Sequence, residues 1–108
     1  MDQIDLQKTT ELIARDFEIE GNPEGITEEQ LFEILSEQIA YLIEHRLEFL
    51  LSLMYRLDVD ERKVEAALSP RAPELAHNGL ARLVLDRQKQ RVFTKRAYKP
   101  PKLEDDEW

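Results

Sequence analysis

Residues 26–57 read ITEEQLFEILSEQIAYLIEHRLEFLLSLMYRL and contain neither glycine nor proline. Thr27 is a favoured N-cap residue, and Gln30 completes a capping box because its side chain can reach back to the Thr27 amide. Ile26 and Leu31 occupy the hydrophobic-staple positions on either side of this cap. The stretch therefore predicts a helix that begins directly after Thr27.

Apolar side chains continue through the whole stretch at helical spacing. One row recurs at every fourth position and consists of Leu31, Leu35, Ile39, Ile43, Leu47 and Leu51. We therefore predict a single helix over residues 28–57, about 45 Å long at 1.5 Å per residue.

The second half of this helix, residues 47–57, is apolar nearly all round. A helix of that character is buried on more than one side. Because exposed apolar patches mark interfaces and two-fold dimers are the commonest soluble assemblies, we expect a homodimer. The predicted partner or dimer interface consists of Leu47, Leu50, Leu51, Met54 and Leu57. The alternative is a monomer in which the first and third helices cover this surface.

Two shorter helices are predicted on either side. The first covers residues 6–18, and its inward stripe consists of Leu6, Thr9, Ile13 and Phe17. The other covers about residues 61–68 and is capped by either Asp58 or Asp60.

The last helix is predicted over residues 73–96, with Pro73 at its first position. The side chains expected to face inward are Leu75, Ala76, Leu80, Leu83, Val84 and Phe93. Asn78-Gly79 is a turn signal, and glycine costs about 1 kcal/mol in a helix interior. We nevertheless predict a continuous helix, because the apolar period passes through this pair.

Together these elements predict an all-α fold. We expect a small helical bundle of about four helices, two long and antiparallel and two shorter, completed by homodimerisation. Residues 1–98 are expected to form a single helical domain. Residues 99–108 are expected to form an extended or disordered acidic tail.

Composition excludes several classes of protein. The 108 residues carry a net charge of −8 and include no cysteine, which excludes disulfides, thiolate metal sites and a cysteine nucleophile. The N-terminus has neither a basic nor an apolar region of the kind found in secretory signals. The most apolar stretch, residues 47–57, is shorter than the ~20 residues of a membrane span. We expect a soluble, cytoplasmic protein with no membrane association.

The charges are unevenly distributed along the chain. Residues 1–44 carry a net charge of −10, whereas residues 82–102 carry +7. The basic helix over residues 82–99 suggests nucleic-acid binding as an alternative function, with phosphate contacts from Arg87, Arg91, Lys95 and Arg96. We favour pairing within the protein or across its dimer, because the overall charge is negative. The expected acidic partners are Glu28, Glu29, Glu33 and Glu37.

Glu74 and His77 have the Glu-x-x-His spacing of carboxylate-bridged di-iron sites in four-helix bundles. One chain supplies one such pair, and a symmetric dimer would supply two. The simpler interpretation is a surface pair at the start of a helix, where glutamate is favoured by the helix dipole. We therefore predict no cofactor and keep a metal-binding bundle as a further alternative.

No glycine-rich phosphate loop, serine nucleophile motif or hydrolase signature occurs in the sequence. Two histidines and no cysteine are a poor set of general bases and nucleophiles. The sequence therefore predicts a protein that is not an enzyme. We expect a non-catalytic interaction or assembly module: a helical homodimer that binds another protein.

Overall fold

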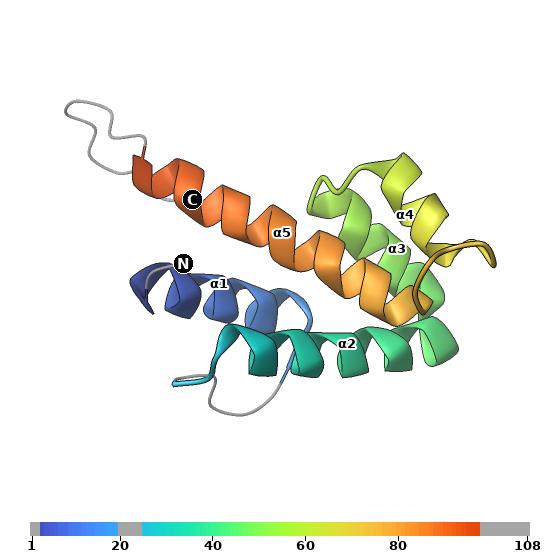
Figure 1. Cartoon of the computed structure of the whole chain (residues 1–108), viewed down its shortest axis with the longest axis horizontal. Helices are drawn as coiled ribbons and strands as arrows, with labels where there is room; N and C mark the ends of the chain where they lie inside the picture. Colours follow the sequence, from blue (N-terminus) through green and yellow to red (C-terminus); the bar gives the residue numbers. More distant parts are fainter. Residues whose placement is uncertain (1–2, 20–24, 98–108) are drawn as a thin grey trace.

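The computed structural model describes residues 3–19 and 25–97, and this part of the chain forms five α-helices and no strand. In chain order they are α1 (Gln3–Asp16), α2 (Glu28–His45), α3 (Leu47–Arg56), α4 (Glu61–Leu68) and α5 (Ala76–Ala97). Helix α5 crosses the molecule antiparallel to α1 and α2 (Figure 1) and packs against α1, α2 and α4. The all-α prediction is confirmed, but the described helices number five rather than about four. The predicted tail, residues 99–108, lies outside the described residues.

The start of α2 agrees with the sequence signals. The Thr27 side chain accepts a hydrogen bond from the Gln30 amide at 3.0 Å, and the Gln30 side chain accepts one from the Thr27 amide at 2.8 Å. This reciprocal pair is the predicted capping box. Ile26 packs against the core and Leu31 is buried within it.

The predicted single helix over residues 28–57 is wrong, because the chain breaks at Arg46. Its backbone angles, φ −145° and ψ 57°, separate α2 from α3. A row that recurs at every fourth residue cannot stay on one face, because a turn takes 3.6 residues and the row from Leu31 to Leu51 winds through about 200°. The break lets each half present its own apolar face. The buried hydrophobic residues are Leu31, Leu35, Ile39 and Leu42 in α2, and Leu50, Leu53 and Met54 in α3.

The two shorter predicted helices are present. Thr9 and Ile13 of α1 are buried, as is Phe17 directly after the helix, while Leu6 is only partly buried. Helix α4 begins after Asp60, whose side chain accepts a hydrogen bond from the backbone amide two residues later at 2.9 Å. Of the two caps left open by the sequence, Asp60 is therefore the one used.

Helix α5 begins three residues later than predicted and buries a different set of side chains. Its buried residues are Leu80, Ala81, Val84, Leu85, Gln88 and Val92. The prediction that Leu75 and Phe93 face inward is wrong, since both are exposed. Leu75 precedes the first turn of the helix. Phe93 lies about 100° around the helix from the buried Val92.

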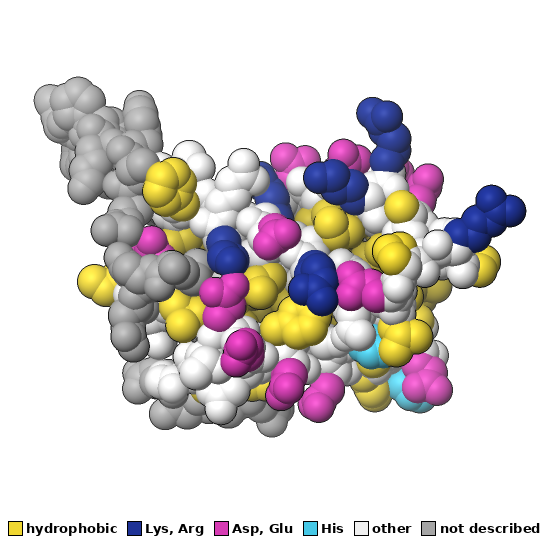
Figure 2. Space-filling model, in the orientation of Figure 1, with side chains coloured by type: hydrophobic (Ala, Val, Ile, Leu, Met, Phe, Trp, Pro, Cys, Tyr) yellow, Lys and Arg dark blue, Asp and Glu magenta, His cyan; other side chains and the backbone are white. Residues whose placement is uncertain are grey.

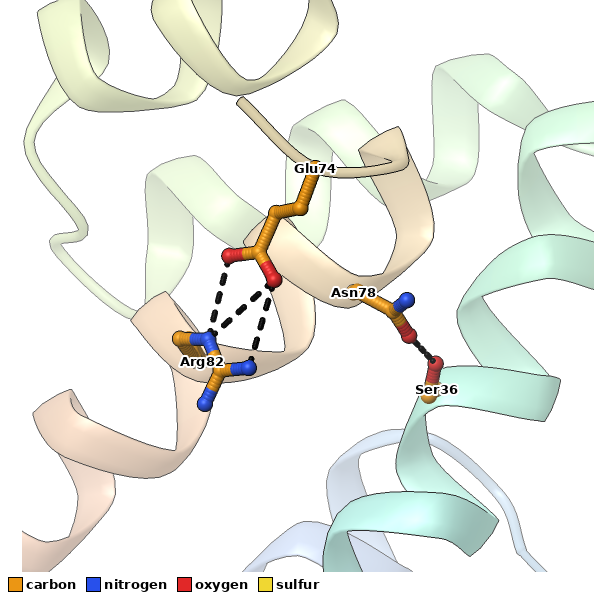
Figure 3. Close-up of polar contacts among 4 residues, drawn as sticks. All are labelled: Ser36, Glu74, Asn78 and Arg82. Carbon is orange, nitrogen blue, oxygen red and sulfur yellow. Dashed lines mark hydrogen bonds and ion pairs between the residues drawn. The ribbon is translucent and has the colours of Figure 1, made fainter. Parts of the chain in front are cut away.

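Asn78 and Gly79 lie inside α5, as the apolar period predicted. The Asn78 side-chain oxygen accepts a hydrogen bond from the hydroxyl of Ser36, in α2, at 2.7 Å (Figure 3). A Cβ atom placed on Gly79 would lie 3.2 Å from the Cβ of Ala67, in α4. The pair that resembles a turn in sequence therefore serves helix packing, one residue toward α2 and the other toward α4.

A single apolar core connects all five helices in the described part of the chain. The largest fully buried side chains include Ile13 of α1, Ile39 of α2 and Leu53 of α3. None of the described helices combines the length and the hydropathy needed to cross a bilayer.

Candidate protein-interaction surface

The outward side of α3 exposes three large apolar side chains in one row. Leu47, Leu51 and Tyr55 are spaced by four residues, so they lie on successive turns of the same side. Their exposed fractions are 41%, 39% and 84%. We call these three residues the outer stripe. Tyr55 was not among the predicted residues, although the four-residue spacing from Leu51 continues to it.

The remaining residues of the predicted interface are turned toward the core, although Met54 also borders the space between α3 and α4. Leu50, Met54 and Leu57 belong to the core of this chain and are at most 5% exposed. They have almost no surface left for a partner. Of the predicted set, only Leu47 and Leu51 keep exposed apolar surface.

A small, mainly apolar notch lies between α3 and α4, directly beside the outer stripe. Its volume is about 240 Å³. It is lined by Leu51, Met54, Tyr55, Val59, Glu61, Val64, Glu65 and Leu68. Because Leu51 and Tyr55 belong to both features, the stripe and the notch form one continuous surface. The contribution of α4 to this surface was not predicted, because it depends on how the chain turns after α3.

The turn at Asp58 directs α4 away from α3 and opens the notch. The Val59 amide donates to the Met54 carbonyl at 3.2 Å, and the Asp58 amide donates to the Tyr55 carbonyl at 3.0 Å. These two bonds form a Schellman motif, which normally places glycine at the position of Asp58. Asp58 adopts the left-handed conformation, with φ 64°. Met54 and Val59, which line the notch, are thus joined by the backbone of the turn itself.

Arg87 of α5 holds the same turn from the other side. Its Nε donates to the Leu57 carbonyl at 3.0 Å, and its guanidinium lies 3.6 Å from the Asp58 carboxylate. Terminal carbonyls of a helix lack intrahelical donors, so this bond satisfies one that would otherwise need water. Arg87, predicted as a phosphate contact, is therefore engaged in holding α5 to the end of α3.

Two carboxylates stand on the α4 side of the notch. Glu61 and Glu65 are four residues apart and share one helical face with Val64 and Leu68. Both glutamates are exposed, and the structure describes no ion pair or side-chain hydrogen bond for either. The surface therefore combines an apolar floor with negative charge along one edge.

The basic face of α5 is the second exposed feature. Arg87, Arg91 and Lys95 line a shallow groove of about 430 Å³ together with Gln90 and Thr94. The structure thus brings three of the four predicted phosphate contacts together on one side of the helix. The fourth, Arg96, lies within α5, but its side chain is outside the described part of the structure.

Two other basic side chains of α5 are paired within the fold, one of them with a predicted acidic partner and the other with Glu74, which was not among those predicted. Lys89 lies 2.6 Å from the carboxylate of Glu28, at the start of α2. Arg82 is paired with Glu74, and its guanidinium also lies 4.9 Å from the centroid of the Phe32 ring. Figure 2 shows basic side chains over α5 bordering acidic ones along α2.

Glu74 and His77, the alternative metal pair, are not joined in the structure. Both carboxylate oxygens of Glu74 accept hydrogen bonds from Arg82, at 3.0 Å from Nε and 3.2 Å from Nη2 (Figure 3). This hydrogen bonding, followed by the charge of Glu74, raises the pKa of Arg82 above its usual value. Among the described residues, no group of three or more His, Cys, Asp or Glu side chains is placed to hold a metal ion.

No protein-family model matches the chain, and comparisons with curated proteins and with solved structures find no match either.

Proposed function

We propose that this chain is a non-catalytic helical interaction module that binds another protein through the outer stripe and the α3–α4 notch. The observation that supports the proposal is the continuity of the two features. Tyr55, at 84% exposure, stands beside a notch whose floor is apolar. Exposed apolar surface that is contiguous and edged by polar residues marks interaction sites more often than it marks ordinary protein surface.

The residue types also suit a binding surface. Tyrosine is enriched at the energetically dominant positions of interfaces because it offers a large apolar body and a polar tip. The notch is smaller than the roughly 300–1,000 Å³ pockets that enclose drug-sized ligands. A cavity of 240 Å³ is better matched to individual side chains of a partner protein.

The homodimer stays a prediction, and the outer stripe alone is small for it. A large side chain has an accessible surface of at most ~250 Å² when fully exposed. With the exposed fractions of its three residues, the outer stripe therefore exposes at most about 400 Å². A stable dimer buries about 800 Å² on each partner. A dimer through this face would therefore need additional contacts from α2 or α4, whereas a small partner segment would not.

Site-specific photocross-linking in cells tests the proposal. A photoreactive phenylalanine analogue replaces Tyr55 in one variant and Tyr41, an exposed residue of α2, in a matched control. We expect a discrete cross-linked product from position 55 and none from position 41. Equal products from both positions, or none from position 55, would contradict the proposal. A product with a second copy of the chain would identify the predicted homodimer.

Nucleic-acid binding by the basic face is a second candidate, supported by the grouping of Arg87, Arg91 and Lys95 in one groove. Its test is the salt dependence of binding to DNA or RNA, since each phosphate contact steepens that dependence. Under this alternative, Arg91→Ala combined with Lys95→Ala weakens binding and reduces the salt slope. Arg87 is unsuitable for the test, because its replacement also removes the bond to Leu57.

A further inference from the structure

We infer that the partner segment is a basic amphipathic helix that lies along the outer stripe with its cationic side chains toward α4. This inference rests on the proposed function, because it names the occupant of the same surface. It draws on the shape of the surface, its area and the sign of the charges at its edge.

The shape favours a helix. The outer stripe runs from Leu47 to Tyr55, eight residue steps along α3, which is about 12 Å at 1.5 Å per residue. On the opposite side of the notch, Glu61, Val64, Glu65 and Leu68 follow an i, i+3, i+4, i+7 pattern along α4. Two helices that diverge from one turn form a groove that accepts a third helix, whose anchors recur at i, i+3 or i+4, and i+7. Two turns of such a partner match the length of the stripe.

The area favours a single segment over a second copy of the whole domain. The outer stripe exposes at most about half of the roughly 800 Å² that each member of a stable dimer buries. One amphipathic helix uses a narrow apolar strip, with a few side chains supplying most of the binding energy. The stripe and notch provide such a strip, with Tyr55 exposed at its end.

The charge selects a cationic partner. Glu61 and Glu65 are the charged side chains that line the notch. The bases of α4, Arg62 and Lys63, occupy positions outside the i, i+3, i+4, i+7 face and do not line it. On α3, Glu48 lies one turn before Leu51 but does not line the notch, so the negative charge at the notch comes from Glu61 and Glu65. A partner helix with lysine or arginine beside its apolar row would meet these carboxylates, whereas an acidic one would be repelled.

A pair of model peptides tests the inference on the full chain. Both peptides are helical, about 20 residues long, with leucines at i, i+4 and i+7. The flanking residues are lysines in one and glutamates in the other. Binding is measured by fluorescence anisotropy of the labelled peptides, and the contacted surface is mapped by amide chemical shifts. We expect the lysine peptide to bind at least about tenfold more tightly than the glutamate peptide and to shift the signals of Leu51, Tyr55 and Glu65.

Charge variants of the protein supply the matched comparison. Glu61→Gln with Glu65→Gln should weaken binding of the lysine peptide. Glu33→Gln with Glu37→Gln removes the same charge at the same spacing from the exposed side of α2 and should leave binding unchanged. Glu65→Gln alone provides a second test that leaves the first turn of α4 intact.

The outcomes separate this inference from the proposed function. Equal binding of both peptides, or shifts confined to other surfaces, would overturn the inference. Failure of the lysine peptide to bind would also overturn it, and a cross-linked protein partner at position 55 would then leave the proposed function standing. A cross-link to a second copy of the chain would show that this surface is a self-association site and not the site of a basic partner helix. Absence of both peptide binding and cross-linking would remove the inference and the proposed function together.

Discussion

The two faces of helix α3 have nearly the same composition, but one is buried in the core and the other is exposed. On its inner face, Leu50 and Leu53 are buried among the side chains of the core. On its outer face, Leu47, Leu51 and Tyr55 remain exposed. The two sets alternate along the same ten residues, so neither hydropathy nor helix propensity distinguishes them.

The difference shows that apolar side chains mark a surface that can be buried. Whether that surface is buried depends on how the other helices pack around it. The inner face is covered because the break at Arg46 gives α3 a different apolar face from α2. The outer face stays open because the turn at Asp58 directs α4 to one side and leaves a notch. We therefore expect the inner face to control stability and the outer face to control binding.

The largest expected difference comes from one pair of substitutions. Leu50→Ala removes a fully buried side chain and should lower the free energy of unfolding by about 2–5 kcal/mol. Leu51→Ala makes the same chemical change on the outer face, where the lost burial is smaller, and should cost less than about 1 kcal/mol. Urea unfolding of both variants measures the difference. Equal losses would show that the two faces are covered alike.

A smaller loss of stability is expected from removing the hydrogen bond that joins α5 to the C-terminal end of α3. Arg87→Ala removes the donor to the Leu57 carbonyl and should lower stability by about 1–3 kcal/mol. Arg56→Ala is the matched control, because Arg56 is exposed in the last turn of α3 and should change stability by no more than about 0.5 kcal/mol. Chemical denaturation compares the two. A neutral Arg87→Ala would mean that water replaces the guanidinium without loss, and that Arg87 is available to an external ligand after all.

Signals that act over a few neighbouring residues could be read from the sequence. The capping box at Thr27 is an example, because both of its hydrogen bonds join residues three apart. The break at Arg46 could not be read in this way, since no glycine or proline marks it and the apolar pattern continues across it. Helix α2 packs against α1 and α5 as well as against α3, and a local pattern does not contain these long-range contacts.

The candidate site was predictable to the same limited degree. Leu47 and Leu51 were predicted because an excess of apolar residues signals an interface. Tyr55 continues their spacing and could have been included on that signal alone. Glu61 and Glu65 could not have been assigned to the site, because their place beside α3 depends on the left-handed turn at Asp58.

Replacing Asp58 in that turn by glycine should stabilise the protein modestly. Asp58 has φ 64°, a conformation that costs a non-glycine residue roughly 1–2 kcal/mol. Asp58→Gly removes this strain but also the pairing with Arg87, which is worth little because the Asp58 side chain is 89% exposed. We expect a net stabilisation of about 0.5–1 kcal/mol in thermal or urea unfolding. Asp58→Ala keeps the strained conformation without the charge and should not be more stable than the native chain. A loss of stability in Asp58→Gly would show that the ion pair outweighs the strain.

The smallest expected change in stability accompanies the largest expected change in binding. Tyr55→Ser removes the most exposed large apolar side chain of the described residues. Serine and tyrosine have similar helix propensities, and little of the tyrosine is buried, so the free energy of unfolding should change by no more than about 0.5 kcal/mol. The same variant should lose the interaction that cross-linking at this position detects, because it deletes the anchor of the outer stripe. Urea unfolding and partner binding are therefore measured on the same preparation. A destabilisation above about 1 kcal/mol would place Tyr55 among the residues that hold the fold together, and the outer face of α3 would then belong to the folding of this chain rather than to its partner.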